Sequence, residues 1–387
     1  MMSSRPLAAQ VQSNSSFASL AARADGARDS DRLDDALVLY GKALAANPAW
    51  VEGWWSLATI QYDQDKYAEA AQGFERVIAA APRDKTGTAR VMLGLCEFQL
   101  GQDEKALKHL QEGEAIGILN DPQLREVMRY HEGTLLQRMG RFGSAQDVLE
   151  SLCRQEGQNT ELKPVLGMAA LRMRDRTPPR PGTRAASVVQ RAGEAQCLGA
   201  QNQFENARKT YDEVVAQNPD FPNLHYAYGK LLLQIHDTKA AVGEFEQEIE
   251  KRPRDVLSRL EIAAVKYRVD SAAGVPYAEQ AVRLAPQLPF GHYLLGLLLV
   301  DTGKYRQAVP QLEMARRAFT SEASVYFALG TAYARTGRKQ QAAEARATFL
   351  RLRRQGASKP TPNVYGEQHS GLPGEGLAAG RQIRPPD

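Results

Sequence analysis

A small residue recurs along most of this chain at steps close to 34 residues, and this period limits the possible fold more than any other feature. It occupies the positions Ala24, Ala58, Gly94, Gly133, Gly167, Ala195, Gly229, Ala263, Gly296 and Gly330. An alanine often follows it twelve residues later, as Ala70 follows Ala58. Periods of this length are typical of arrays of one repeated supersecondary unit. The chain is therefore predicted to be a stack of similar units rather than a set of unrelated domains.

The unit at residues 54–78 shows what each copy contains. Trp54, Leu57 and Ala58 share one face of a predicted first helix, because residues three and four apart are neighbours on a helix. Phe74 and Val77 belong to the apolar stripe of a second helix. Two helices this short cannot bury both stripes alone, so neighbouring units are expected to stack into a continuous core.

Turn and stop residues separate the predicted helices. Between the two helices of a unit lies a residue that tolerates a left-handed backbone. These residues are Gly101, Gly140, Gly303, Gly337, Asp31, Asp65, Asn202 and Asp270. Five units close with a proline that stops the second helix. These prolines are Pro48, Pro82, Pro219, Pro253 and Pro286.

The 34-residue period, with its aromatic, Leu-Gly/Ala, Ala, Phe/Tyr and Pro positions, resembles the tetratricopeptide repeat family across residues 17–354. The resemblance implies an all-α fold. It implies a right-handed α-solenoid of about nine to ten helix–turn–helix units, interrupted once.

The predicted organisation has five parts. Residues 1–16 form a flexible N-terminal arm, and residues 17–159 form an N-terminal array of four units. Residues 160–187 hold a degenerate repeat and a Pro-rich break, which is either a hinge or a bulged repeat. Residues 188–354 form a C-terminal array of five units. Residues 355–387 form a Gly/Pro-rich tail that is expected to be disordered.

Composition excludes several classes of protein. The net charge is only +4 and the charges are interspersed, which favours a solvated surface over a nucleic-acid interface. No apolar run is long enough to span a membrane. A cytoplasmic location is expected for the chain as written, and a periplasmic or exported one if an upstream signal peptide is missing. The composition, rich in Ala, Arg and Leu, points to a bacterial source.

Three cysteines, Cys96, Cys153 and Cys197, are odd in number and far apart. They form neither a CxxC pair nor a disulfide framework in the sequence pattern. Each falls within a predicted helix, where a free cysteine behaves as a small buried apolar residue.

No motif for catalysis or for metal binding stands out. The histidines form no zinc spacing, and His225 and His292 occupy the same repeat position as Trp54, so packing explains both. The chain has no phosphate-binding loop and no Gly-x-Ser-x-Gly elbow. We therefore expect no enzyme activity, no cofactor, no metal and no small-molecule substrate.

The resemblance places binding on the first helices, which line the concave groove of the family. The expected partner-binding residues are Trp55, Tyr62, Val91, Leu95, Phe98, Tyr130, Tyr226, Lys230, Leu233, Tyr267, Tyr293, Leu297 and Phe327. Such an apolar stripe suits an extended or helical polypeptide segment. The alternative is that neighbouring helices bury these side chains as ordinary core. Lys230 is the one cation among them, which disfavours the carboxylate grip known from some family members.

The sequence thus predicts a non-catalytic scaffold or adaptor that binds a peptide or protein segment in an aromatic-lined groove. Two alternatives stay open. One is an accessory subunit of an exported or cell-envelope assembly. The other is a regulatory partner of an enzyme on another chain. The partner's identity and the oligomeric state are left undecided.

Overall fold

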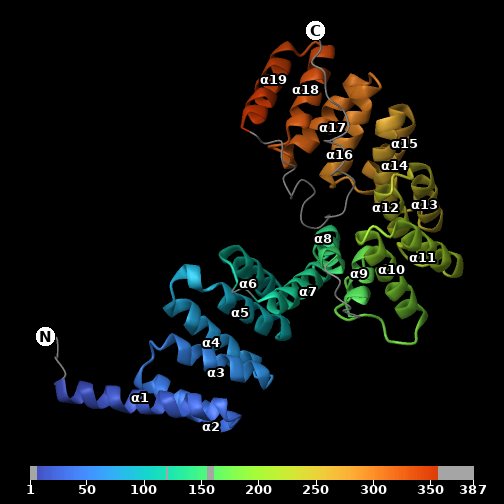
Figure 1. Ribbon diagram of the computed structural model, residues 1–387. Coiled ribbons are helices and arrows are strands. Elements are labelled where there is room, and N and C mark those ends of the chain that lie inside the picture. The colour runs from blue at the N-terminus through green and yellow to red at the C-terminus, as the bar shows by residue number, and fades with distance from the viewer. Residues whose placement is uncertain (1–6, 119–120, 155–160, 356–387) are drawn as a thin grey trace. The chain divides into compact units, whose positions relative to one another are not determined.

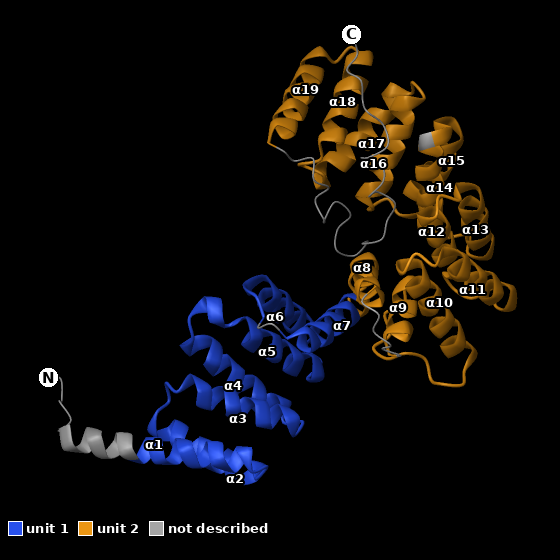
Figure 2. Ribbon diagram, viewed as in Figure 1, with its two compact units in different colours: residues 1–136 blue, residues 137–387 orange. Residues whose placement is uncertain are grey.

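The computed structural model describes residues 7–118, 121–154 and 161–355 (Figure 1). Within these ranges the chain forms nineteen α-helices and one 3-10 turn, and no strand. The predicted all-α fold is confirmed. The chain divides into two compact units, residues 1–136 and 137–387, which Figure 2 distinguishes by colour.

Unit 1 contains antiparallel helix pairs that follow the predicted repeat. The helices are α1 (Leu7–Asp29), α2 (Leu33–Ala46), α3 (Val51–Asp63), α4 (Tyr67–Ala80), α5 (Gly87–Gln99) and α6 (Asp103–Ile116), with the 3-10 turn η1 (Arg83–Lys85) before α5. Helix α7 (Pro122–Arg138) runs across the boundary between the units. The two helices of each pair pack together, as do α2 with α3 and α4 with α5.

Unit 2 continues the pattern after two shorter helices. Its helices are α8 (Phe142–Cys153), α9 (Leu162–Ala170), α10 (Arg184–Ala200), α11 (Phe204–Gln217), α12 (Leu224–Gln234), α13 (Thr238–Lys251), α14 (Leu257–Val269), α15 (Ser271–Leu284), α16 (Pro289–Asp301), α17 (Tyr305–Ala318), α18 (Ala323–Arg335) and α19 (Lys339–Arg354). From α10 onward, each helix packs against the next one in the chain.

The backbone conformation of the turn residues follows the prediction at seven of the eight positions. The backbone is left-handed at Gly101, Gly140, Gly303, Gly337, Asp31, Asp65 and Asn202. The prediction for Asp270 is wrong, because its φ is −150° and its side chain instead caps α15 by accepting the amide of Ala273. Helix α14 runs almost directly into α15 there, so a left-handed turn residue has no place. Between α12 and α13 the left-handed residue is His236, which the sequence analysis missed.

The prolines stop second helices as predicted. Pro48, Pro82, Pro219, Pro253 and Pro286 each lie two residues beyond the end of a second helix: α2, α4, α11, α13 and α15. A proline at this point cannot continue the helix, so the chain turns toward the next repeat.

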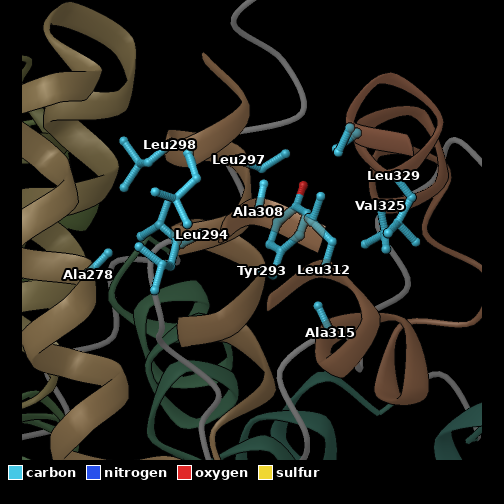
Figure 3. Close-up of a cluster of buried hydrophobic side chains, with 14 of the residues drawn as sticks. Ala278, Tyr293, Leu294, Leu297, Leu298, Ala308, Leu312, Ala315, Val325 and Leu329 are labelled. Carbon is cyan, nitrogen blue, oxygen red and sulfur yellow. The ribbon is translucent and has the colours of Figure 1, made fainter. Parts of the chain in front are cut away.

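The core lies between the helices of a pair and between neighbouring pairs. In one cluster of unit 2, Leu294 and Leu298 of α16 are fully buried, and Leu312 and Val325 reach the same interior from α17 and α18 (Figure 3). The repeated small residue lets the two helices of a pair approach each other. At Gly229 an added methyl group would lie 2.5 Å from a ring carbon of Phe245.

Helix α9 departs from the paired pattern. It is followed by a loop rather than by a second helix, and it packs directly on α10. The two helices meet at Gly167 and Gly193, where an added methyl group would overlap the carbonyl oxygen of Val189 or Lys163. The Pro-rich residues predicted to break the repeat connect α9 to α10, and Thr183 caps α10 by accepting the amide of Ala186.

The interpretation of Cys153 and Cys197 as free cysteines is wrong. Their sulfurs form a disulfide that joins the end of α8 to α10, with 5.3 Å between the Cα atoms. The pairing depends on α9, because a lone helix without a second partner allows α8 and α10 to pack against each other. Cys96 is free and buried, as predicted.

Other predictions about chain organisation stay open. The exact number of units and the division into arrays at residues 160–187 stay predictions. Helix α1 begins at Leu7, while residues 1–6 of the predicted arm and residues 356–387 of the predicted tail lie outside the described part of the chain. Among the described helices, none combines the length and the apolar character needed to cross a bilayer.

Candidate protein-binding surface

The residues at the Trp54 position of five repeats have a structural role. The Trp54 indole N–H donates to the carbonyl of Pro48, six residues earlier, at 2.9 Å. Nε2 of His225 and His292 makes the equivalent bond to Pro219 and Pro286 at 3.0 and 2.9 Å. Further equivalents are Arg259 to Pro253 and Tyr326 to Thr320. These side chains anchor the start of each first helix to the end of the preceding repeat, which supports the packing interpretation of both histidines.

In unit 1 the expected aromatic residues keep part of their surface exposed. Trp55 and Tyr62 on α3, Phe98 on α5 and Tyr130 on α7 are all half-buried. By contrast, Val91 and Leu95 on α5 are buried in the core. The first-helix face of unit 1 therefore presents rings rather than aliphatic side chains.

Edge-on ring contacts fix two of these side chains. The ring of Trp55 lies 5.5 Å from that of Phe74, and Tyr62 lies 5.4 Å from Tyr67. Both Trp55 and Tyr62 pack on a buried cluster that includes Phe74 and Cys96. Burial raises the pKa of the Tyr62 hydroxyl, so Tyr62 is neutral near pH 7. A ring held by one edge and exposed at the other suits a binding anchor, since little side-chain entropy is lost on contact.

His131 of α7 joins the other two rings of this face. Its ring centre lies 4.3 Å from that of Phe98 and 5.4 Å from that of Tyr130. The sequence analysis did not select His131, which lies two residues before the small residue Gly133 and directly after Tyr130. Its contacts place it between two expected anchors.

In unit 2 the matching positions are more strongly tied to the fold. Tyr226 of α12 is 4% exposed, and its hydroxyl lies 3.4 Å from the carboxylate of Glu261 on α14. Lys230, the expected groove cation, forms an ion pair with the same carboxylate at 2.9 Å. Glu261 itself is fully buried, so the Lys230 charge is engaged by the neighbouring repeat. Arg172, whose guanidinium lies 5.9 Å from the Tyr226 ring, adds a second cation that the sequence analysis missed.

The next repeats of unit 2 also bury expected anchors. Tyr293 is 7% exposed and its hydroxyl is 2.8 Å from Ser324 of α18. Leu297 is buried in the same cluster, as Figure 3 shows beside Tyr293. Tyr267 packs against this cluster but keeps part of its surface exposed.

The thirteen expected residues thus separate by exposure. Five are buried and belong to the core: Val91, Leu95, Tyr226, Tyr293 and Leu297. Eight keep exposed surface: Trp55, Tyr62, Phe98, Tyr130, Lys230, Leu233, Tyr267 and Phe327. Only the second group can contact a partner without rearrangement of the fold.

Among the described residues, neither a metal site nor a charged ligand pocket stands out. No group of three or more His, Cys, Asp or Glu side chains among them could hold a metal ion. A pocket of about 420 Å³ lies between the Pro-rich loop and helices α9 and α10. Prolines and small neutral side chains line it, and none of its lining residues titrates.

Comparison with known families decides the classification. A model of the tetratricopeptide repeat matches residues 21–85, 193–256 and 293–360, which together make up just over half of the chain. The chain belongs to the tetratricopeptide repeat family. Repeats of this family generally serve as non-catalytic scaffolds for protein–protein interaction, so polypeptide partners are expected.

Solved structures share the repeat fold at low identity. A MamA RS-1 double mutant is 20% identical and covers 43% of this chain and 96% of its own, with a TM-score of 0.39. A tetratricopeptide repeat protein from Parabacteroides merdae ATCC 43184 is 15% identical and covers 74% of this chain and 99% of its own, with a TM-score of 0.34. These matches carry no argument about function. No curated protein matches the chain.

Proposed function

We propose that this protein is a non-catalytic scaffold or adaptor that holds a peptide or protein segment against the first-helix face of unit 1. The observation that carries the proposal is the set of half-buried rings of Trp55, Tyr62, Phe98 and Tyr130 on α3, α5 and α7. Clustered aromatic side chains with exposed surface are typical of interaction sites rather than of solvated surface.

The chemistry of this face defines the segment that it can bind. Its rings are apolar, and the nearby His131 adds another flat ring. An extended or helical segment with apolar side chains at regular spacing would cover such rings and exclude water from them. The proposed contacts are the four expected residues of unit 1 that keep exposed surface, and the buried Val91 and Leu95 are left out.

A double substitution tests the proposal. Aromatic anchors often account for ~2 kcal/mol or more of binding free energy each, so Trp55→Ala with Tyr62→Ala should weaken partner binding by about thirty-fold for each ring, or several hundred-fold together. Affinity is measured against the partner that the wild-type chain captures, and thermal melting is recorded for each variant. The matched control is Val38→Ala with Met314→Ala, which removes exposed apolar side chains from the second helices α2 and α17. Unchanged affinity of the double variant would contradict the proposal, and a collapse of its fold would assign both rings to the core.

The disulfide supports a second candidate function, an accessory subunit of an exported or cell-envelope assembly. Disulfides persist in oxidising compartments and are rare in the reducing cytosol. Cys153 and Cys197 are both buried, so their disulfide is protected from exchange with small thiols. The test is mass spectrometry of the chain isolated from its native cells after immediate alkylation. A linked Cys153–Cys197 peptide would support export, and two alkylated cysteines would contradict it.

A further inference from the structure

The end of unit 2, from the turn after α16 through α19, carries a charge imbalance that helices α10 to α16 do not share. Residues 302–355 hold eleven Lys and Arg against three Glu and no Asp. Residues 184–301 hold thirteen Lys and Arg against fifteen Asp and Glu. The excess of positive charge in residues 302–355 is larger than the net charge of the whole chain, which is +4.

Cations of the two segments also differ in their partners. In the earlier segment five of the thirteen cations form ion pairs within a helix or between neighbouring elements. The pairs are Arg191–Glu213, Arg208–Asp237, Lys230–Glu261, Lys251–Asp220 and Arg252–Glu248. In residues 302–355, all of them described, the three glutamates bond instead to neutral groups: Glu313 to Tyr333, Glu322 to Ser324 and Glu344 to Gln340. The cations of this segment are therefore left without intramolecular neutralisation.

Five of these cations gather at one edge of the fold. They are Lys304, Arg306, Arg335, Arg338 and Lys339, all exposed, and we call them the basic edge. The edge follows the turn from α16 to α17 and the turn from α18 to α19, and Figure 1 shows α17, α18 and α19 as neighbours. Asp301, three residues before Lys304, accepts the hydroxyl of Ser271 at 2.5 Å.

Helix electrostatics do not explain the basic edge. Arg316, Arg317, Arg351, Arg353 and Arg354 lie in the last turns of α17 and α19, where cations stabilise a helix. Lys304 and Arg338 lie instead at the N-caps of the same helices, and neither helix has an acidic residue in its first turn. Positive charge at a helix N-terminus is unfavourable, so these cations do not serve the stability of the fold.

Two rings hold arginines of the edge in place. The Arg335 guanidinium lies 5.9 Å from the centre of the Tyr305 ring, and Arg338 lies 5.9 Å from that of Tyr333. A guanidinium stacked on a ring still presents its N–H groups outward, in the fork that matches a carboxylate.

We propose that the basic edge binds an acidic polypeptide segment, on a surface separate from the aromatic face of unit 1. Its charge is complementary to carboxylates, and the family binds polypeptides. A single-stranded nucleic acid would need free rings on which to stack bases, but arginines lie over Tyr305 and Tyr333. An anionic membrane would need apolar side chains to insert, but Met314 and Leu350, the large apolar residues exposed on α17 and α19, lie outside the edge.

The proposal is tested by fluorescence anisotropy with the full chain and a short labelled peptide of alternating Glu and Ser. Arg306→Glu with Lys339→Glu should weaken binding about ten-fold or more, and added salt should weaken binding to the wild type. The matched control is Arg317→Glu with Arg354→Glu, which makes the same charge change at the other ends of α17 and α19 and should alter affinity less than about two-fold. Arg306→Gln with Lys339→Gln supplies a milder variant if the charge reversal disturbs melting.

Four outcomes would overturn the proposal. Equal losses in the edge variant and in the control would show attraction to net charge alone. Tighter binding of a single-stranded oligonucleotide or of anionic vesicles would assign another class of partner. Salt-sensitive self-association that the edge variant abolishes would make a second copy of the chain the occupant. Loss of peptide binding in Trp55→Ala/Tyr62→Ala, with its fold intact, would place the acidic segment on the aromatic face.

Discussion

The first-helix faces of the two units are built from matching repeat positions, yet they differ in what their aromatic side chains do. In unit 1, Trp55 and Tyr62 are fixed by ring contacts and keep exposed surface. In unit 2, Tyr226 and Tyr293 are buried, and their hydroxyls contact Glu261 and Ser324 of the next first helices. The same position can therefore serve binding in one repeat and cohesion between repeats in another.

The largest expected effect is the loss of stability when a buried ring of unit 2 is removed, compared with the loss when a half-buried ring of unit 1 is removed. Tyr226→Ala should lower the free energy of unfolding by about 3–5 kcal/mol, because it removes a buried ring and leaves a cavity. Tyr62→Ala should cost less than about half of that, since its ring is partly solvated in the folded state. Urea denaturation of the two variants, followed by circular dichroism, measures the difference. Equal losses would show that the two faces do not differ.

The disulfide sharpens the comparison, because unit 2 has a covalent link and the described part of unit 1 has only the free Cys96. Cys153→Ala with Cys197→Ala should destabilise the chain by about 2–4 kcal/mol, as expected when a closed loop is opened in the unfolded state. Thermal melting with and without reductant checks this. Because the buried disulfide is protected in the folded chain, reduction is carried out in urea before refolding. The reduced wild type should melt at a lower temperature than the oxidised one and the double variant should be unaffected by reductant, whereas equal melting temperatures of reduced and oxidised wild type would contradict a stabilising link.

A smaller effect concerns pH at the repeat position that holds Trp54 in unit 1 and His225 in unit 2. Burial of His225 disfavours its charged form, but the Glu244 carboxylate, 2.6 Å from Nδ1, together with the Pro219 carbonyl and the charge of Glu248, outweighs burial and raises the pKa of His225. The folded state then binds the proton more tightly than the unfolded state does. This contribution is fully present below about pH 6.5 and is lost as the pH rises through the raised pKa.

Matched substitutions isolate this pH effect. His292 occupies the same position, but its Nδ1 faces the neutral Gln311 at 2.7 Å. Glu244→Gln should flatten the dependence of stability on pH between about 6 and 8, while Gln311→Ala should leave it unchanged. A wild-type protein whose stability rises with pH over this range would contradict the assigned charge state.

The sequence was sufficient for features that depend on one repeat and its immediate neighbours. The prolines, the left-handed turns and the small residues act locally, so their period was enough to predict them. Asp270 was misassigned because a shortened turn there removes the left-handed residue.

Features that join different repeats could not be predicted in the same way. The Cys153–Cys197 disulfide requires α8 and α10 to lie together, which follows from the missing partner of α9. The burial of Tyr226 and the pairing of Lys230 both depend on Glu261, a residue of the next repeat. Repeat spacing places a residue on a helix face, but packing of the neighbouring helix decides whether that residue is exposed.

Site-specific photo-crosslinking tests the central claim, that a polypeptide lies on the first-helix face of unit 1. A photoreactive amino acid replaces Phe98 on this face, and in a second variant it replaces Val38, an exposed residue of the second helix α2. After capture and irradiation, the Phe98 variant should carry a crosslinked polypeptide that mass spectrometry identifies, and the Val38 variant should carry none. Crosslinks of equal yield from both positions, or from Val38 alone, would contradict the account.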